Sequence, residues 1–437
     1  MSRTDGARDP RRASGRGRSY ATSGVRAPRR TGDEADDPGR IPALDVLRGF
    51  ALFGILVVNA LMTAGPYSAF GGGPDASDLD RAVSWLVTAL VAAKFYLLFS
   101  FLFGYGFVLQ ERSARREGAA FAPRHLRRTL ALFTLGAAHA VLLYPGDILT
   151  TYAVLALPLY GLRRLAPRTA LRIAAGLLLA LFALLLLEGL LTVALTEPRT
   201  VAEYVPTVAD TVAAHRGDAA DVLGAHLSEL PDAIAAHVLY APDFFAAFLA
   251  GLAAAKVRLL ERRGRDRAWL RRTALRWLPL GLLGGVFTAV CAGGPLDHRW
   301  YDVGQAASVL TAPALTASYA CALLLLLDRF RTPAAWLAAS GRMALTHYLT
   351  QSLVLALVFT GYGAGLYDRV GAALVLAGCV VLYGAQLALG VRLMGRRRYA
   401  PAELLLRTVT LARRPAGRPA DPSTAGPPAS DAVPPAR

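Results

Sequence analysis

The chain alternates between long apolar stretches and shorter polar segments. The first two stretches, Leu44–Ala64 and Val91–Leu109, are each long enough to cross a hydrocarbon core ~30 Å thick. The whole pattern predicts ten helices, at about 43–64, 85–110, 129–145, 147–165, 169–195, 236–257, 275–294, 303–328, 341–361 and 370–393. We therefore expect an all-α fold, a polytopic bundle of about ten transmembrane helices.

The loops between these stretches differ in charge, and the sign alternates along the chain. Glu111–Arg128 holds six arginines and two acids, and Lys256–Arg276 holds nine basic residues and two acids. In contrast, Glu197–Asp232 holds seven acids and two arginines. Because basic loops stay on the cytoplasmic side of a membrane, this alternation predicts that both termini are cytoplasmic.

Composition supports a membrane protein and argues against other classes. Of the 437 residues, 54% are hydrophobic and only 18% are charged, which is too apolar for a soluble protein of this length. The net charge of +17 is divided among alternate loops and both tails, so it does not indicate a nucleic-acid surface. Three cysteines without a CxxC or Cys/His cluster indicate neither a disulfide framework nor a metal site. The predominance of arginine, alanine and leucine is typical of a bacterial chain, which we expect in the cytoplasmic membrane.

The same patterns divide the chain into segments. We expect a disordered basic tail at 1–40, helices one to five at 41–196, an acidic extracytoplasmic loop at 197–235, helices six to ten at 236–395, a basic juxtamembrane segment at 396–413 and a disordered tail at 414–437.

Ionisable residues inside the apolar stretches are the candidates for function, because a charge facing lipid is costly. Counting depth along each predicted helix gives two groups. The outer group is Asn59, Lys94, His139 and Asp147. The inner group is Asp45, Arg48, Glu111 and Arg342, with His347, Tyr348, Gln351 and Ser352 slightly deeper.

Each candidate also has a structural interpretation. Asp45 and Arg48 can form an ion pair at the membrane surface, and Asn59 can join helices by hydrogen bonds. Lys94 can extend toward the interface. His139 lies among small residues that let another helix approach, where a histidine can simply be part of the core.

Several of these segments resemble the YeiB-like family of bacterial inner-membrane proteins. The opening LDVLRGFALFGILVVN, the stretch KFYLLFSFLFGYGF at Lys94–Phe107, and His139 followed by GDIL and Tyr152 are similar to three family motifs. Gly341–Ser352 resembles the start of the family's C-terminal domain of unknown function. There are two departures: His347 stands where the family usually has asparagine, and the last motif keeps Pro401, Glu403 and Arg407 but loses a glycine and tryptophans.

The opening DxxRG pattern is also distantly similar to membrane acyltransferases of the heparan-alpha-glucosaminide N-acetyltransferase type. Those enzymes move acyl groups from cytoplasmic acyl-CoA to an acceptor on the far side of the membrane. The histidine that follows their asparagine is missing here, since residues 60–80 contain none. The resemblance therefore requires His139 to supply the base or acyl carrier from another helix.

Together these observations lead to a hypothesis of acyl transfer through the helical bundle. His139, Asp147, Asn59 and Lys94 would be catalytic, while Asp45, Arg48 and Arg342 would bind acyl-CoA. The acceptor would be a sugar, lipid or envelope hydroxyl.

A transporter of a small solute is the alternative, because internal ionisable residues also serve solute pathways. A scaffold without chemistry is the third. Dependence on acyl-CoA would favour the enzyme, and uptake of an unchanged solute would favour the transporter.

Overall fold

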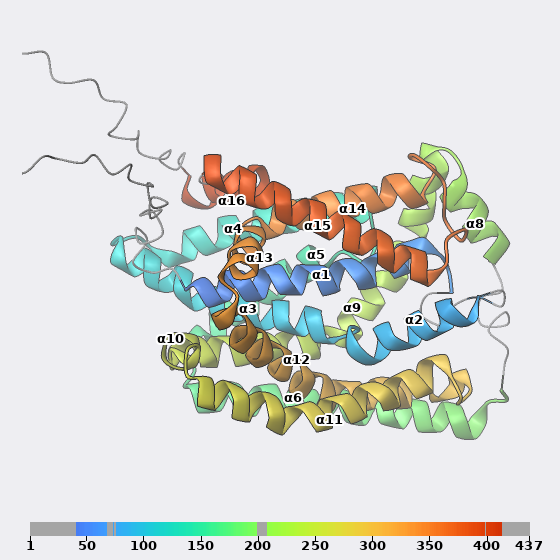
Figure 1. Ribbon diagram of the computed structural model, residues 1–437, viewed down its shortest axis with the longest axis horizontal. Helices are drawn as coiled ribbons and strands as arrows, with labels where there is room; N and C mark the ends of the chain where they lie inside the picture. The colour runs from blue at the N-terminus through green and yellow to red at the C-terminus, as the bar shows by residue number, and fades with distance from the viewer. Residues whose placement is uncertain (1–40, 68–72, 74–75, 199–207, 398, 413–437) are drawn as a thin grey trace, which may run out of the picture. The chain divides into compact units, whose positions relative to one another are not determined.

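The computed structural model describes residues 41–67, 73, 76–198, 208–397 and 399–412, and in these residues it contains helices but no strand. The all-α class is confirmed. The elements, drawn in Figure 1, are α1 (Pro42–Ala64), α2 (Asp78–Leu90), α3 (Lys94–Arg116), α4 (Phe121–Leu142), α5 (Ile148–Gly161), η2 (Leu162–Arg164), α6 (Pro167–Leu195), α8 (Val208–Arg216), α9 (Ala219–Lys256), α10 (Leu259–Arg263), α11 (Arg267–Gly293), η3 (His298–Trp300), α12 (Tyr301–Arg329), α13 (Arg331–Arg342), α14 (Ala344–Phe359), α15 (Ala372–Arg396) and α16 (Pro401–Leu411).

Seven helical segments in the described residues are long and apolar enough to cross a membrane. They are α1, α2 with α3, α6, α9, α11, η3 with α12, and α15. Among the expected ten, α5 and α14 are short, with 14 and 16 residues, and the first half of α4 is strongly basic. The multi-pass helical bundle is thus confirmed, whereas the count of about ten spans stays a prediction.

The second expected helix, 85–110, is broken in the structure. Helix α2 ends at Leu90 and α3 begins at Lys94, with Ala93 between them at a positive φ of 68°. A helix end leaves carbonyl groups without partners, and burial makes them costly. Here the Lys94 ammonium donates to the Thr88 carbonyl at 3.1 Å, and the Tyr319 hydroxyl donates to the Leu90 carbonyl at 3.1 Å.

The acidic segment 197–235, expected as a loop, is partly helical. Helix α8 lies within it, and α9 begins at Ala219, where the Asp218 and Asp221 side chains form a reciprocal cap. The alanine-rich sequence then continues as one helix through Pro231 and Pro242 into the apolar stretch. The segment has no apolar run of membrane length, so hydropathy alone did not reveal its helices.

Close helix crossings are made by glycines. A Cβ atom at Gly104 would overlap the backbone of Phe248, and one at Gly251 would overlap the backbone of Phe101, so α3 and α9 approach closely at both positions. Gly49 and Gly341 bring α1 and α13 together in the same way. Helix α1 also packs on α3, α14 and α15. Helices from the two expected halves, 41–196 and 236–395, therefore share one core.

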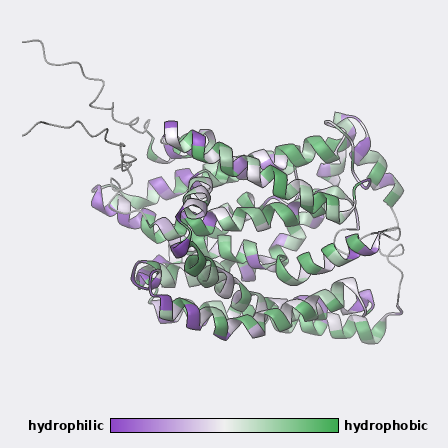
Figure 2. Cartoon of the chain, in the orientation of Figure 1, coloured by the Kyte–Doolittle hydropathy of each residue, from purple (hydrophilic) through white to green (hydrophobic). Residues whose placement is uncertain are grey.

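Polar residues gather at the two ends of the bundle, as Figure 2 shows, and apolar residues cover its length. We call the end formed by Glu111–Arg128, Arg163–Arg172 and Lys256–Arg276 the basic end, and the end that holds α8 and the start of α9 the acidic end. In Figure 1 the basic end lies at the left, near α10, and the acidic end at the right, near α8.

The expected tails, 1–40 and 414–437, lie outside the described residues. The juxtamembrane segment 396–413 contains α16, which packs against α4 and α14. Its Arg407 guanidinium lies 4.9 Å above the Tyr399 ring.

Candidate functional site

His139 and Asp147 form the centre of the candidate site. His139 is one turn from the end of α4, and Asp147 is the N-cap residue of α5, so the short link between these helices brings the two side chains together. His139 Nδ1 lies 3.0 Å from Asp147 Oδ1, and only 1% of each side chain is exposed. The sequence placed both residues in the outer group, and the structure brings these two into contact.

Asp147 is held in place from several directions. Its Oδ2 accepts hydrogen bonds from the backbone amide and the hydroxyl of Thr150, each at 2.7 Å. Its Oδ1 accepts a hydrogen bond of 3.3 Å from the Tyr348 hydroxyl. Gly136 makes this geometry possible, since a Cβ atom there would lie 2.6 Å from Asp147 Oδ2.

Tyr348 belongs to this site although the sequence placed it in the inner group. Its ring lies 4.9 Å from the His139 ring, at an interplanar angle of 32°. Depth counting treated 341–361 as one full span, but α13 ends at Arg342 and the short α14 begins at Ala344. The aromatic residue on a neighbouring segment carried no sequence signal that linked it to His139.

The other nitrogen of the histidine is available for chemistry. Both ring nitrogens of His139 are buried and neither makes a hydrogen bond to the residues that the structure describes, although Nδ1 lies 3.0 Å from Asp147 Oδ1. With the Asp147 carboxylate beside Nδ1, Nε2 is the ring nitrogen that remains able to accept a proton.

A cavity of about 220 Å³ lies beside this pair at the acidic end. Its wall includes the link Leu143–Gly146, which connects His139 to Asp147, and the histidines of α8 and α9, His215 and His226. His215 Nε2 lies 3.4 Å from Glu229 Oε1, and a His226 ring nitrogen lies 3.1 Å from the Val141 carbonyl oxygen.

Tyr367 closes the same cavity from the loop that precedes α15, and its ring stacks on His215 with centroids 4.3 Å apart. Burial raises the pKa of the Tyr367 phenol, so the hydroxyl stays protonated at neutral pH. The sequence did not predict this cavity, because His215, His226 and Glu229 lie in the segment that was interpreted as a loop.

Comparison with known proteins places the chain in a family. Residues 254–413 match the model described as "Protein of unknown function (DUF418)". The chain is 32% identical over 394 residues to the uncharacterized protein YxaH of Bacillus subtilis, covering 85% of this chain and 94% of that protein. It is 29% identical over 387 residues to the uncharacterized protein YeiB of Escherichia coli, covering 84% and 95%. The chain belongs to the YeiB-like family.

A third relative extends this similarity. An uncharacterized 39.9 kDa protein of Bacillus acidopullulyticus is 28% identical over 398 residues, covering 86% of this chain and 95% of that protein. The family model covers residues 254–413, which overlaps the segment 236–395 that we expected to be the family's C-terminal domain. The motif Gly341–Ser352 therefore lies inside this range and not at its start.

The last motif of this YeiB-like protein has a structural task. The Glu403 carboxylate accepts hydrogen bonds from the backbone amides of Leu345 and Thr346, at 2.8 and 3.1 Å, and from the Thr346 hydroxyl. It therefore caps the N-terminus of α14 from a different helix, α16. A negative charge at this end also interacts favourably with the helix dipole.

Two members of the expected outer group are not joined to the His139 pair. Asn59 lies on α1, which packs mainly on α13, α3, α14 and α15 rather than on α4 or α5. Lys94 is 2% exposed and its ammonium binds the end of α2, while its backbone carbonyl accepts from the Thr316 hydroxyl.

The expected donor-binding residues meet at the basic end. Asp45 and Arg48 form an ion pair of 3.7 Å on α1, and Arg342 lies on α13, whose Gly341 packs directly against the Asp45 backbone. Arg48 Nη2 would lie 2.8 Å from a Cβ atom at Gly106, so this glycine leaves room for the guanidinium. Arg128 on α4 is close enough to Arg48 for the two charges to repel.

A second buried polar group lies nearer the middle of the bundle. Asp243 on α9 is 1% exposed, and its Oδ2 accepts a hydrogen bond of 2.7 Å from the Tyr96 hydroxyl. The Ser100 and Tyr152 hydroxyls are 2.6 Å apart, and Tyr152 donates to the Tyr96 carbonyl at 3.2 Å. In the part of the chain that the structure describes, no three His, Cys, Asp or Glu side chains are arranged to hold a metal ion.

Proposed function

We propose that this YeiB-like protein transfers an acyl group from cytoplasmic acyl-CoA to a hydroxyl acceptor on the opposite side of the cytoplasmic membrane. The observation that carries the proposal is the buried His139–Asp147 pair, in which Asp147 Oδ1 lies 3.0 Å from Nδ1 and Nε2 has no partner among the described residues. A histidine held in this way is a suitable general base.

The proposed reaction uses His139 twice. Its Nε2 removes the proton of the acceptor hydroxyl while the oxygen forms a bond to the acyl carbonyl carbon. The carbon–sulfur bond of the thioester breaks, the sulfur leaves with the bonding electrons, and Nε2 returns the proton to it. The products are an acylated acceptor and the free CoA thiol, and Asp147 stabilises the imidazolium that forms between the two steps.

The two ends of the bundle suit the two substrates. Arg48, Arg128 and Arg342 place positive charge at the basic end, where the phosphates of the donor would bind. Arg128 and His139 are eleven residues apart on α4, ~16 Å along the helix axis, a distance that the extended pantetheine arm of CoA would bridge. The cavity of about 220 Å³ at the acidic end offers tyrosine, histidine and glutamate side chains to a small sugar or alcohol.

The test is incubation of the purified, detergent-solubilised protein with radiolabelled acetyl-CoA and added sugar and lipid acceptors. We expect wild type to transfer label and His139→Gln to lose at least a hundredfold of the rate. The matched control is His347→Asn, which changes another buried histidine to the residue usual in the family and should keep the activity. Equal transfer by wild type and His139→Gln would exclude His139 as the base.

Transport of a small solute is the second candidate, and two observations favour it. Helix α2–α3 is discontinuous next to a buried lysine, and Asp243 has an Oδ1 with no partner among the described residues. Broken helices and buried carboxylates occur together in secondary transporters. Proteoliposomes containing the pH dye pyranine would report solute-dependent proton movement, which Asp243→Asn should abolish. Absence of acetyl-CoA binding together with such movement would favour transport over acyl transfer.

A further inference from the structure

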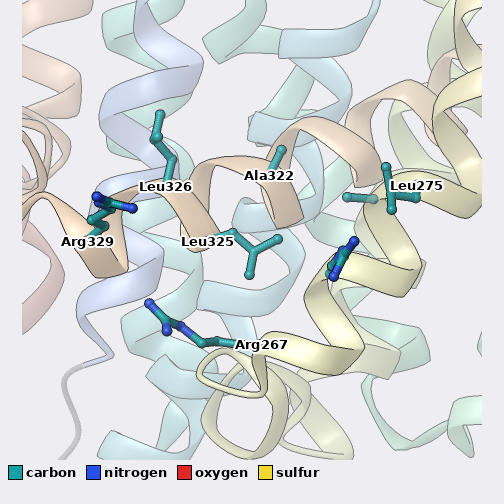
Figure 3. A pocket seen from close by; sticks show the side chains of 8 residues that line it. Arg267, Leu275, Ala322, Leu325, Leu326 and Arg329 are labelled. Carbon is teal, nitrogen blue, oxygen red and sulfur yellow. The ribbon is translucent and has the colours of Figure 1, made fainter.

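An open groove of about 500 Å³ lies between α11 and α12 at the basic end (Figure 3). Its walls are apolar along most of their length and arginine-lined at one end. Figure 3 shows Arg267 and Arg329 on the side of the groove away from Leu275. This combination of a charged end and an apolar trough is suited to binding an amphiphile, a molecule with a charged head and an apolar tail.

Each wall of the groove is one face of a helix. On α11 the lining residues Arg267, Arg271 and Leu275 are four positions apart, so they lie in a row along one side. On α12 the row runs through Ala322, Leu325, Leu326 and Arg329. Because the helices are antiparallel, the start of α11 and the end of α12 bring Arg267 and Arg329 to the same end, and Arg271 follows one turn further along α11.

The arginines carry more charge than their neighbours neutralise. Arg267 forms an ion pair with Asp328 at 2.7 Å. Arg271 and Arg329 form no ion pair with any residue that the structure describes. Two guanidinium groups therefore remain for an anion, and guanidinium groups bind phosphate in a two-pronged geometry.

The groove opens toward lipid at the depth of the headgroups. Leu275 and Leu326 are 57% and 55% exposed on the outside of the bundle. Trp277, an exposed aromatic residue of the kind that marks the membrane interface, lies six residues after Arg271, ~9 Å further along α11. The arginines are thus on the aqueous side of the interface and the leucines on the hydrocarbon side.

We propose that this groove binds one anionic phospholipid, with its phosphate on Arg271 and Arg329 and an acyl chain along Leu275, Leu325 and Leu326. Basic residues between transmembrane helices on the cytoplasmic side are suited to such headgroups. The site is separate from the His139 pair, because α11 packs mainly on α12 and α2, whereas His139, Asp147 and Tyr348 lie on or beside α4, α5 and α14. The proposed lipid site does not depend on the proposed acyl transfer.

The experiment is native mass spectrometry of the full-length protein in detergent, titrated with phosphatidylglycerol or with phosphatidylcholine of the same chains. We expect wild type to retain one phosphatidylglycerol in preference to phosphatidylcholine. The double variant Arg271→Gln/Arg329→Gln should weaken phosphatidylglycerol binding by about thirtyfold, since each arginine near an anionic headgroup contributes about a fivefold change.

The matched control is Arg262→Gln/Arg265→Gln, which removes two exposed arginines from the same basic segment without touching the groove. It should keep the preference. A second variant, Leu325→Trp, fills the trough and leaves the charge unchanged, and it should also reduce binding. Loss of binding in the control equal to that in the groove variant would overturn the proposal, and so would undiminished binding in both groove variants.

Two competitors distinguish the lipid from other phosphates. Inorganic phosphate and acetyl-CoA are added to the wild-type protein that has one bound phosphatidylglycerol. We expect neither to displace the lipid at concentrations near its own binding range, because neither fills the apolar trough as an acyl chain does. Displacement by acetyl-CoA would identify a donor site instead and contradict the lipid assignment.

Discussion

At the scale of single residues, Asp147 has two tasks that share one carboxylate. One oxygen caps α5 through Thr150, and the other faces His139 and Tyr348. The sequence placed His139 and Asp147 in one outer group with Asn59 and Lys94, and it did not single out this pair. It did not suggest Tyr348, which comes from a segment about two hundred residues later.

The two tasks of Asp147 can be separated by substitution. Asparagine is as good an N-cap as aspartate but has no negative charge. We therefore expect Asp147→Asn to leave the thermal unfolding midpoint nearly unchanged and to lower acyl transfer by about 10²- to 10⁴-fold. Asp147→Ala should lose the N-cap as well, which should lower the free energy of unfolding by about 1–2 kcal/mol. Unfolding in detergent and transfer of label measure the two effects; full activity of Asp147→Asn would show that the carboxylate does not assist His139.

Glu403 is a second residue whose effect can be isolated. Glu403→Ala removes the acceptor of two backbone amides and one hydroxyl at the start of α14, and we expect it to destabilise the protein by about 1–3 kcal/mol. Thr408→Ala on the same helix is the control, because among the described residues the Thr408 hydroxyl donates to the Leu404 carbonyl of its own helix. The free energy of unfolding of Thr408→Ala should stay within about 0.5 kcal/mol of the wild-type value. Equal thermal stability of Glu403→Ala and wild type would mean that the cap contributes nothing.

At the scale of helices, the DxxRG opening is explained in part by packing. Its glycine, Gly49, lies against the Leu337 carbonyl of α13, and Gly341 on α13 lies against the Asp45 backbone of α1. The motif therefore fixes a helix crossing at the basic end and positions Arg48 there. The break between α2 and α3 is another helix-scale feature, with Lys94 and Tyr319 binding the carbonyls that the break exposes.

The crossing of α1 and α13 gives a prediction with an internal control. Gly341→Ala places a methyl group on the Asp45 backbone, so the helices must separate, at a cost of about 1–3 kcal/mol. Gly378→Ala on α15 meets nothing within 4 Å and should be neutral or stabilise the helix by about 0.5–1 kcal/mol. Thermal unfolding of both variants in detergent tests the contrast. Similar midpoints for both would show that the two helices can separate without cost.

At the scale of the whole molecule, the described helices place charge at both ends of one bundle, and the positive-inside rule gives that bundle a direction. The basic end should face the cytoplasm. This direction decides which substrate would reach the His139 pair from which side. With this direction, the groove between α11 and α12 would lie in the inner leaflet.

Cysteine labelling in cells tests the direction. Cys291, Cys321 and Cys379 are buried, so the wild-type protein should react little with a membrane-impermeant maleimide. We expect Ala220→Cys, at the acidic end, to be labelled in intact cells, and Arg265→Cys, at the basic end, only after permeabilisation. The reverse pattern would invert the bundle and exclude cytoplasmic acyl-CoA as a ligand of Arg48.

The sequence by itself determined that this is an all-α membrane protein of the YeiB-like family, and it placed His139 and Asp147 among the candidate site residues. Hydropathy and the charge of loops are properties of consecutive residues, and the link between α4 and α5 is short enough to bring its two ends together. Only the tertiary structure decided that Tyr348 completes this pair, that Lys94 binds a broken helix, that Glu403 caps α14, and that His215 and His226 line a cavity. Those contacts depend on how distant helices cross, and the crossings are set by glycine positions and helix breaks that leave hydropathy unchanged.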